Sequence, residues 1–360
     1  LPLLLCIALC LGLSLLLSGC SALLERDYAS VTPHNAVPAT EGDPSILRAD
    51  SYQELVNALI YFISGGMEVG TVRLYIDAEN VEAFLSDACL EVVQEDPLGA
   101  YCVEFIKYTV DPVVTYFQAD LQITYRRTRE QVAAIVQATG VTAIRSELKS
   151  ALVSFAPERA LRISYFDEDE NFILDLVRQA YYDAPACALG MPEVELSIYP
   201  DSGRQRIVEL LLTYPLEHDT LEERRNDLAY VLEQLAQELG GLTGQRRIRS
   251  AAQSLLEAGS FDPEGGSTAY DLFHAGAADS EGFSLAFAAL CQQLDLSCQV
   301  VQGTRLEEPH FWNVVHTPSG WRHLDLTADA GEEFPLYTDV QLEELGYVWQ
   351  AGSVPQCVEG

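Results

Sequence analysis

The sequence predicts an α+β protein in which two related modules precede a separate C-terminal domain. Three observations lead to this prediction. Helical and alternating apolar patterns are interleaved along the chain, the pattern of residues 50–130 returns in residues 140–218, and a turn-rich link at 259–267 separates the last region from the rest. The length of 360 residues suits two or three domains, because a single core stops growing near about 250–300 residues.

The first module, residues 50–130, is expected to begin with a helix, because Leu55, Leu59 and Phe62 recur at helical spacing. The apolar residues of 72–76 then alternate, which is typical of a strand. A second helix and two strands complete the module and are expected near residues 81–88, 103–110 and 113–126.

The second module, residues 140–218, repeats this order at an offset of about 90 residues. Leu148 and Leu152 correspond to Leu55 and Leu59 of the first module. We therefore predict two tandem α-β-α-β-β modules. The aromatic pairs Tyr116-Phe117 and Tyr181-Tyr182 are interpreted as core packing, with a platform for stacking a ligand as the alternative.

The N-terminal segment, residues 1–19, is rich in leucine, carries no charge and is followed by Cys20. A short apolar segment that closes on small residues is typical of an export signal. With the cysteine it resembles the signal-peptidase site of bacterial lipoproteins, and the resemblance implies that Cys20 becomes the lipidated first residue. The alternative is an uncleaved helix that spans the membrane. We expect an extracytoplasmic protein, lipid-anchored to the bacterial cell membrane, with residues 20–49 as a disordered tether.

The net charge of −33 excludes some partners for the folded part. Nucleic acid and anionic lipid need a basic face, so neither is expected to bind it directly. The six cysteines beyond Cys20 are an even number, which permits disulfides in an exported protein, with buried free thiols as the alternative. They are Cys89, Cys102, Cys187, Cys291, Cys298 and Cys357. No metal site or cofactor is predicted, because the sequence lacks a Cys-x-x-Cys pair or a histidine cluster.

A helical connector is predicted over residues 219–258. One charged helix is expected at 221–239, where Gly240-Gly241 ends it, and another at about 246–258. The C-terminal domain, residues 259–360, follows.

Three side chains in this domain have the order of a catalytic triad. Ser280 precedes an apolar helix, and His310 and Asp325 lie in runs that alternate like strands. A hydroxyl nucleophile, an imidazole base and a carboxylate that orients the base would form such a triad. Pairing of the two strands would place His310 beside Asp325. The alternative is a buried polar pair whose hydrogen bonds satisfy each other.

This region resembles the transglutaminase-like superfamily, which is related to the papain-like cysteine proteases. The resemblance is carried by Ala269, Tyr270, Leu272, Gly282, Phe283, Ala286, Phe287, Cys298, His310, Trp312, Asn313, Trp321, Asp325 and Thr327. It implies a papain-like α+β domain with the triad positions at Ser280, His310 and Asp325. It also implies that Gly282, Trp312 and Asn313 form the site wall. Ser280 stands where the family has its nucleophilic cysteine.

The serine divides the functional hypotheses. A thiol is partly ionised near neutral pH, whereas a hydroxyl must lose its proton during attack, and a site shaped for sulfur holds oxygen too far from its target. The first hypothesis is a catalytically degenerate domain that binds peptides or envelope proteins, or that acts in envelope assembly. The second is an active amide acyltransferase or peptidase that uses Ser280, His310 and Asp325. A third assigns the function to the two modules.

Ser280 also has an explanation without catalysis, because serine is among the best helix N-caps. Asp279 is able to cap the same helix from one residue earlier. His316 and His323 lie outside the motif and are expected at the surface.

Overall fold

The computed structural model describes residues 38–359 apart from residues 41, 77–79 and 329–333. The predicted export signal, Cys20 and most of the predicted tether lie outside the described residues. The described chain forms two compact units. One consists of the residues up to Leu90 with Ile106–Ile123, and the other of Glu91–Phe105 with Thr124 onward. Among the described helices, none combines the length and the apolar character that crossing a bilayer requires.

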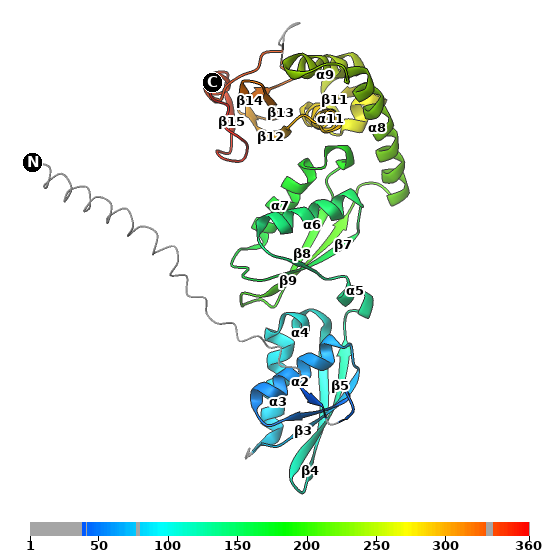
Figure 1. Cartoon of the computed structure of the whole chain (residues 1–360), viewed down its shortest axis with the longest axis vertical. Coiled ribbons are helices and arrows are strands. Elements are labelled where there is room, and N and C mark those ends of the chain that lie inside the picture. Colours follow the sequence, from blue (N-terminus) through cyan, green and yellow to red (C-terminus); the bar gives the residue numbers. More distant parts are fainter. Residues whose placement is uncertain (1–37, 41, 77–79, 329–333, 360) are drawn as a thin grey trace, which may run out of the picture. The chain divides into compact units, whose positions relative to one another are not determined.

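The first sheet has the strand order β1-β2-β3-β5-β4. Its strands β3, β4 and β5 are labelled in Figure 1. Strand β2 is parallel to β3, and β3 is antiparallel to β5. Ser51 caps the helix α2 (Tyr52–Ser64) by accepting a hydrogen bond from the Glu54 amide, and the apolar face of α2 is buried. The elements are β1 (Ala39–Thr40), β2 (Ile46–Ala49), α2 (Tyr52–Ser64), β3 (Val69–Leu74), α3 (Val81–Glu95), α4 (Pro97–Cys102), β4 (Val103–Val113) and β5 (Tyr116–Tyr125).

The second sheet has the order β6-β7-β9-β8. Its first pair is parallel and its next pair antiparallel, as in β2-β3-β5. The elements are α5 (Arg129–Ala133), β6 (Val136–Ala138), α6 (Val141–Val153), β7 (Glu158–Ile163), α7 (Glu170–Tyr182), η1 (Pro185–Cys187), β8 (Glu193–Tyr199) and β9 (Arg206–Thr213). The strands β2 and β6 were absent from the predicted order, because four and three residues are too few to show a period. Strands β1 and β2 lie within the range expected to be a tether.

The C-terminal domain contains a four-stranded antiparallel sheet in the order β14-β13-β12-β15. The helix α11 packs against β12 and β13, and it is buried on all sides from Gly282 to Cys291. The elements are α8 (His218–Leu239), α9 (Gly244–Ala258), β10 (Ser260–Gly266), α10 (Ala269–Ala275), β11 (Ala277–Ala278), α11 (Ser280–Gln293), β12 (Cys298–Arg305), β13 (Glu308–Thr317), β14 (Gly320–Leu324), α12 (Asp339–Glu344) and β15 (Tyr347–Trp349).

One hydrophobic core joins the second sheet to this domain. Leu210 of β9, Leu228 of α8 and Phe287 of α11 belong to the same cluster of buried side chains. The mixed α+β architecture predicted from the sequence is confirmed. Of the described cysteines, all six are free thiols, which is the alternative to disulfides that the sequence left open.

Gly303 holds β12 close to β15. A Cβ atom on Gly303 would overlap the carbonyl oxygen of Val348 and lie 2.7 Å from the ring of Trp312. The residue is therefore required for close approach rather than for a special backbone angle.

We expect Gly303→Ala to destabilise the C-terminal domain by about 1–3 kcal/mol, because the added methyl group overpacks the contact between β12 and β15. The three tryptophans of the chain, Trp312, Trp321 and Trp349, all lie in this domain, so urea unfolding followed by tryptophan fluorescence reports on it. Gly241→Ala is the control, because a Cβ there has no neighbour within 4 Å. Equal unfolding midpoints for the two variants would contradict this account.

Candidate active site

Ser280 is the first residue of α11, and its hydroxyl does not cap the helix. Asp279 is the N-cap residue, whose carboxylate accepts a hydrogen bond of 2.9 Å from the amide of Gly282. The Ser267 hydroxyl donates to the same carboxylate at 2.6 Å. Of the two capping explanations given by the sequence, the one based on Asp279 is therefore confirmed and the one based on Ser280 is wrong.

The hydroxyl of Ser280 is held from the neighbouring strand. The amide of Phe311 in β13 donates a hydrogen bond of 3.2 Å to Oγ of Ser280. Phe311 directly follows His310, so the serine lies next to the strand that carries the imidazole. Within the described part of the chain, no hydrogen bond joins Oγ of Ser280 to the ring of His310.

His310 and Asp325 are in direct contact. Nε2 of His310 lies 2.6 Å from Oδ2 of Asp325, and both side chains are buried. Asp325 follows the end of β14, which pairs with β13. The structure thus brings the predicted base and its predicted orienting carboxylate together.

Asp325 accepts hydrogen bonds from two further residues. The amide and the hydroxyl of Thr327 donate to Oδ1 at 2.8 and 2.7 Å, and the hydroxyl of Tyr347 donates to Oδ2 at 2.7 Å. Burial by itself raises the pKa of Asp325, but the hydrogen bond and charge of His310 and the bonds from Thr327 outweigh it, and the pKa lies below its usual value. The carboxylate is ionised at neutral pH and can only accept.

The ionised carboxylate fixes the tautomer of His310. Because Asp325 only accepts, Nε2 of His310 carries the hydrogen and donates it. In the neutral ring the lone pair then lies on Nδ1, which is the nitrogen that could take up a proton from a nucleophile. The arrangement is chemically suited to a general base oriented by a carboxylate.

The three residues expected to form the site wall make close contacts around the triad positions. Trp312 is completely buried, and its ring lies 6.2 Å from that of His310 with 23° between the planes. The side-chain amide of Asn313 donates to the carbonyl of Ser284 at 3.0 Å, which ties β13 to α11. A Cβ on Gly282 would lie 2.8 Å from the carbonyl oxygen of Gly266. All three residues therefore hold the triad positions in place.

The second module contacts the surroundings of the site, which was not predicted from the sequence. The hydroxyl of Tyr182, the last residue of α7, donates to Oε1 of Glu281 at 3.0 Å. The ring of Tyr182 also lies 5.9 Å from that of Phe311. Burial raises the pKa of Glu281 to about 7, the Tyr182 hydrogen bond lowers it, and the charge of Asp279 raises it. No local pattern in the sequence marks these distant residues as neighbours.

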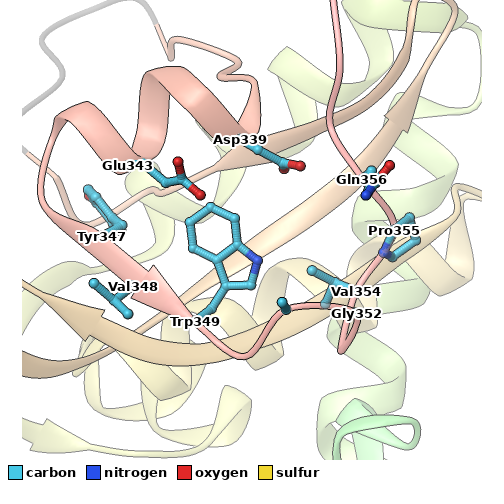
Figure 2. Close-up of a pocket in the computed structure, with 10 residues that line it drawn as sticks. Asp339, Glu343, Tyr347, Val348, Trp349, Gly352, Val354, Pro355 and Gln356 are labelled. Atoms are coloured by element: carbon cyan, nitrogen blue, oxygen red, sulfur yellow. The ribbon is translucent and has the colours of Figure 1, made fainter.

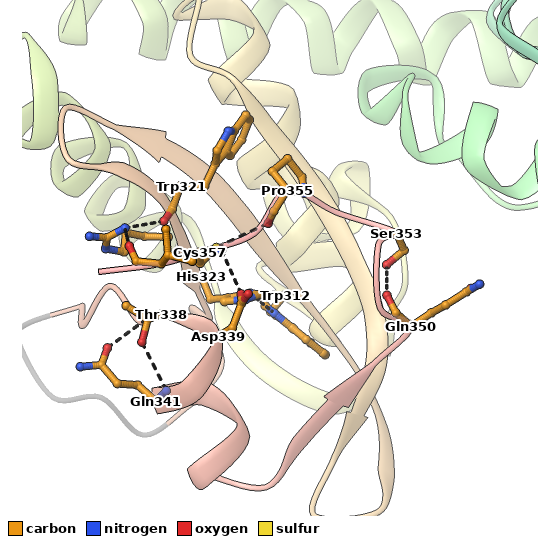
Figure 3. A network of polar contacts seen from close by, with 12 residues as sticks. Trp312, Trp321, His323, Thr338, Asp339, Gln341, Gln350, Ser353, Pro355 and Cys357 are labelled. Carbon is orange, nitrogen blue, oxygen red and sulfur yellow. Dashed lines mark hydrogen bonds and ion pairs between the residues drawn. The ribbon is translucent and has the colours of Figure 1, made fainter. Parts of the chain in front are cut away.

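His323 is completely buried, so its predicted surface position is wrong, whereas His316 is exposed as predicted. The indole nitrogen of Trp312 donates to Nδ1 of His323 at 3.0 Å, and Nε2 of His323 lies 2.9 Å from Oδ1 of Asp339 (Figure 3). The amide of Cys357 donates to the same oxygen at 3.0 Å. This network fastens the C-terminal segment to the sheet.

The same network has the composition of a metal site. A ligand atom from each of His323, Asp339 and Cys357 lies within 4.8 Å of the others. The indole N–H of Trp312 can only donate, so Nδ1 of His323 holds the lone pair and Nε2 carries the hydrogen. A metal would need the lone pair on Nε2. We therefore interpret the group as a hydrogen-bonded network.

A hollow of about 430 Å³ lies beside this network (Figure 2). Asp339, Glu343, Trp349 and Pro355 are among the residues that line it. The Asp339 side chain is 27% exposed, so solvent reaches the network from this hollow although His323 is sealed.

Comparison with known proteins identifies a family for the region that contains this site. Residues 233–326 match the model of the transglutaminase-like superfamily, and this range contains Ser280, His310 and Asp325. The chain therefore contains a transglutaminase-like domain. Among curated proteins, none matches the chain.

Three solved structures are similar to the chain. One is a TGase at 15% identity, with 65% of this chain and 70% of that chain covered and a TM-score of 0.30. A candidate cysteine protease from Cytophaga hutchinsonii has 13% identity, coverage of 44% and 66%, and a TM-score of 0.28. A candidate protease from Parabacteroides distasonis has 9% identity, coverage of 71% and 40%, and a TM-score of 0.22.

We expect the buried His323 to make stability depend on pH. Burial lowers the pKa of His323 below 6.5, against smaller opposing effects of Asp339 and Glu343, so the unfolded chain takes up this proton first as the pH falls. The contribution of neutral His323 to the free energy of unfolding is complete above about pH 6.5 and is lost as the pH falls through the lowered pKa. Urea unfolding at a series of pH values should show a shallower dependence for His323→Gln than for the wild type. His316→Gln is the control, and equal slopes for all three proteins would refute the role of His323.

For Glu281 we expect a contribution to stability that is lost as the pH rises, which is opposite to the dependence expected for His323. Its raised pKa means that between about pH 4.5 and about pH 7 the folded state binds a proton that the unfolded state has lost. The stabilisation of the folded state by this proton is complete below about pH 4.5 and is lost as the pH rises through about 7. Glu281→Gln should therefore become more stable relative to the wild type as the pH rises through this range. Glu264→Gln, at an exposed position of β10, is the matched control and should follow the wild type.

Proposed function

We propose that the transglutaminase-like domain binds extended peptide segments without turnover, in a lipoprotein anchored outside the cytoplasmic membrane through Cys20. The observation that carries this proposal is the state of the nucleophile position. Ser280 stands where the resemblance places a cysteine, and its oxygen is held by the amide of Phe311. The pair of His310 and Asp325 is intact beside it.

Oxygen and sulfur differ in how readily they attack as nucleophiles. A serine hydroxyl attacks only if its proton moves to a base during the attack, which requires a short contact with Nδ1 of His310. Oxygen has a shorter reach than sulfur, and an approach that is too long by about 0.5–1 Å costs orders of magnitude in rate. A site with the shape of a thiol site and an oxygen at position 280 would bind a substrate without reacting.

The survival of His310 and Asp325 needs no catalytic explanation. A buried carboxylate must be fully hydrogen-bonded, and Asp325 receives its bonds from His310, Thr327 and Tyr347. Loss of the imidazole would leave part of this buried charge unpaired. The pair would therefore persist in a binding domain for structural reasons alone.

The extracytoplasmic location is supported by the sequence. The uncharged, leucine-rich residues 1–19 lead to Cys20 with small residues immediately before it. The excess of acidic residues, 54 against 21 basic ones, suits a soluble surface that does not adhere to anionic lipid. In this setting we infer that the ligands are peptides or exposed segments of envelope proteins.

An active amide acyltransferase or peptidase is the second candidate. It is favoured by the finding that Asp279 caps α11, because the hydroxyl of Ser280 is then not needed as the cap of the helix. In such a reaction Oγ would attack the amide carbon and pass its proton to Nδ1 of His310. The amine would then leave with that proton, and water or another amine would take the acyl group from the serine.

Labelling with a fluorophosphonate separates the two candidates. We expect the purified wild-type protein to label no faster than Ser280→Ala, because the hydroxyl is not activated. Ser280→Cys should in turn gain reactivity toward iodoacetamide that disappears in the double variant with His310→Ala, because a thiol at this position has the base it needs. Labelling of the wild type that depends on Ser280 would overturn the inert assignment and establish the enzyme.

A further inference from the structure

We propose that the open edge of β12 is the docking site for the peptide, and that the peptide adds to the sheet as an extra strand with acidic side chains facing α6 and α7. This inference rests on the proposed peptide-binding function and names the ligand class and the surface that takes it.

The edge exists because β15 covers only part of β12. Strand β12 pairs with β13 along its whole length, from Cys298 to Arg305. On its other side β15 pairs only with Gly303, Thr304 and Arg305. The chain then leaves the edge in a turn in which the amide of Ser353 donates to the carbonyl of Gln350. Residues 298–302 thus form a sheet edge that β15 does not cover.

The register shows which backbone groups this edge presents. The amide of His316 donates to the carbonyl of Ser297 at 2.9 Å, so residue 297 faces β13. In an antiparallel pair the direction of the backbone groups alternates from one residue to the next. The amides and carbonyls of Cys298, Val300 and Gln302 therefore point away from β13. They form a row that an added strand would satisfy.

The edge opens into a groove rather than onto a flat surface. A cavity of about 660 Å³ is lined by residues 298–302 of β12, by residues 350–354, and by side chains of α6 and α7. All of these residues belong to the same compact unit. The uncovered stretch of five residues is about 17 Å long, which matches a short extended peptide.

The wall formed by α6 and α7 is basic, although the chain as a whole is strongly acidic. It carries Arg145, Lys149 and Arg178. Arg145 forms a forked ion pair with Asp183, and Arg178 pairs with Asp175. Among the described residues, none forms an ion pair with Lys149. One positive charge therefore remains in the groove, and it favours a peptide with acidic side chains.

The groove borders one residue that contacts the surroundings of Ser280. Tyr182 lines the groove and donates its hydroxyl to Glu281, the neighbour of Ser280. This arrangement gives the second module a direct role in binding the ligand.

The test is binding of fluorescein-labelled peptides of about ten residues to the purified protein, followed by fluorescence anisotropy. The probes are an alternating threonine–glutamate peptide, an alternating threonine–lysine peptide, and the glutamate peptide with N-methyl groups on its central amides. We expect the glutamate peptide to bind about tenfold more tightly than either of the others. N-methylation removes backbone donors and leaves the charges unchanged, so it isolates strand addition.

Lys149→Glu should weaken binding of the glutamate peptide about tenfold. Arg246→Glu makes the same change in net charge at an exposed position of α9 and should have no effect. Equal binding of the methylated and parent peptides, equal effects of the two variants, or failure of the wild type to bind would each overturn the proposal.

The outcome is separable from that of the proposed function. Peptide binding together with Ser280-dependent fluorophosphonate labelling would overturn only the claim that the site is inert. An unlabelled Ser280 together with no peptide binding would overturn the docking site and leave the inert assignment of Ser280 standing.

Discussion

The C-terminal domain depends on one buried carboxylate. Asp325 cannot be removed from water without compensation, and the compensation comes from β13 through His310, from the following loop through Thr327, and from β15 through Tyr347. These three segments converge because the buried carboxylate accepts a hydrogen bond from each of them. A site of this kind is rigid before any ligand arrives, and the orientation of the imidazole follows from the same bonds that stabilise the fold.

The second module and the C-terminal domain belong to the same compact unit. Its sheet shares a hydrophobic core with α8 and α11, and its helix α7 ends at Tyr182, which reaches Glu281. Partial burial at this contact raises the pKa of Glu281. The module therefore shapes the surroundings of position 280.

The sequence predicted the mixed architecture and the order of most helices and strands, because these follow from local periodicity. It also placed His310 beside Asp325, because strand pairing brings nearby segments together. Tyr347, Glu281 with Tyr182, and buried His323 were not predicted. Each depends on packing between segments distant along the chain, and a single histidine or tyrosine looks the same whether it is buried or exposed. The short strands β2 and β6 were missed because so few residues carry no period.

The aspartate that caps α11 has a consequence for how such a protein changes over generations. Because Asp279 supplies the cap, the side chain at position 280 contributes little to keeping the helix folded. An exchange of one atom there, sulfur for oxygen or the reverse, would alter reactivity at almost no cost to the scaffold. A single substitution at position 280 would therefore change the reactivity of the domain and leave its scaffold folded.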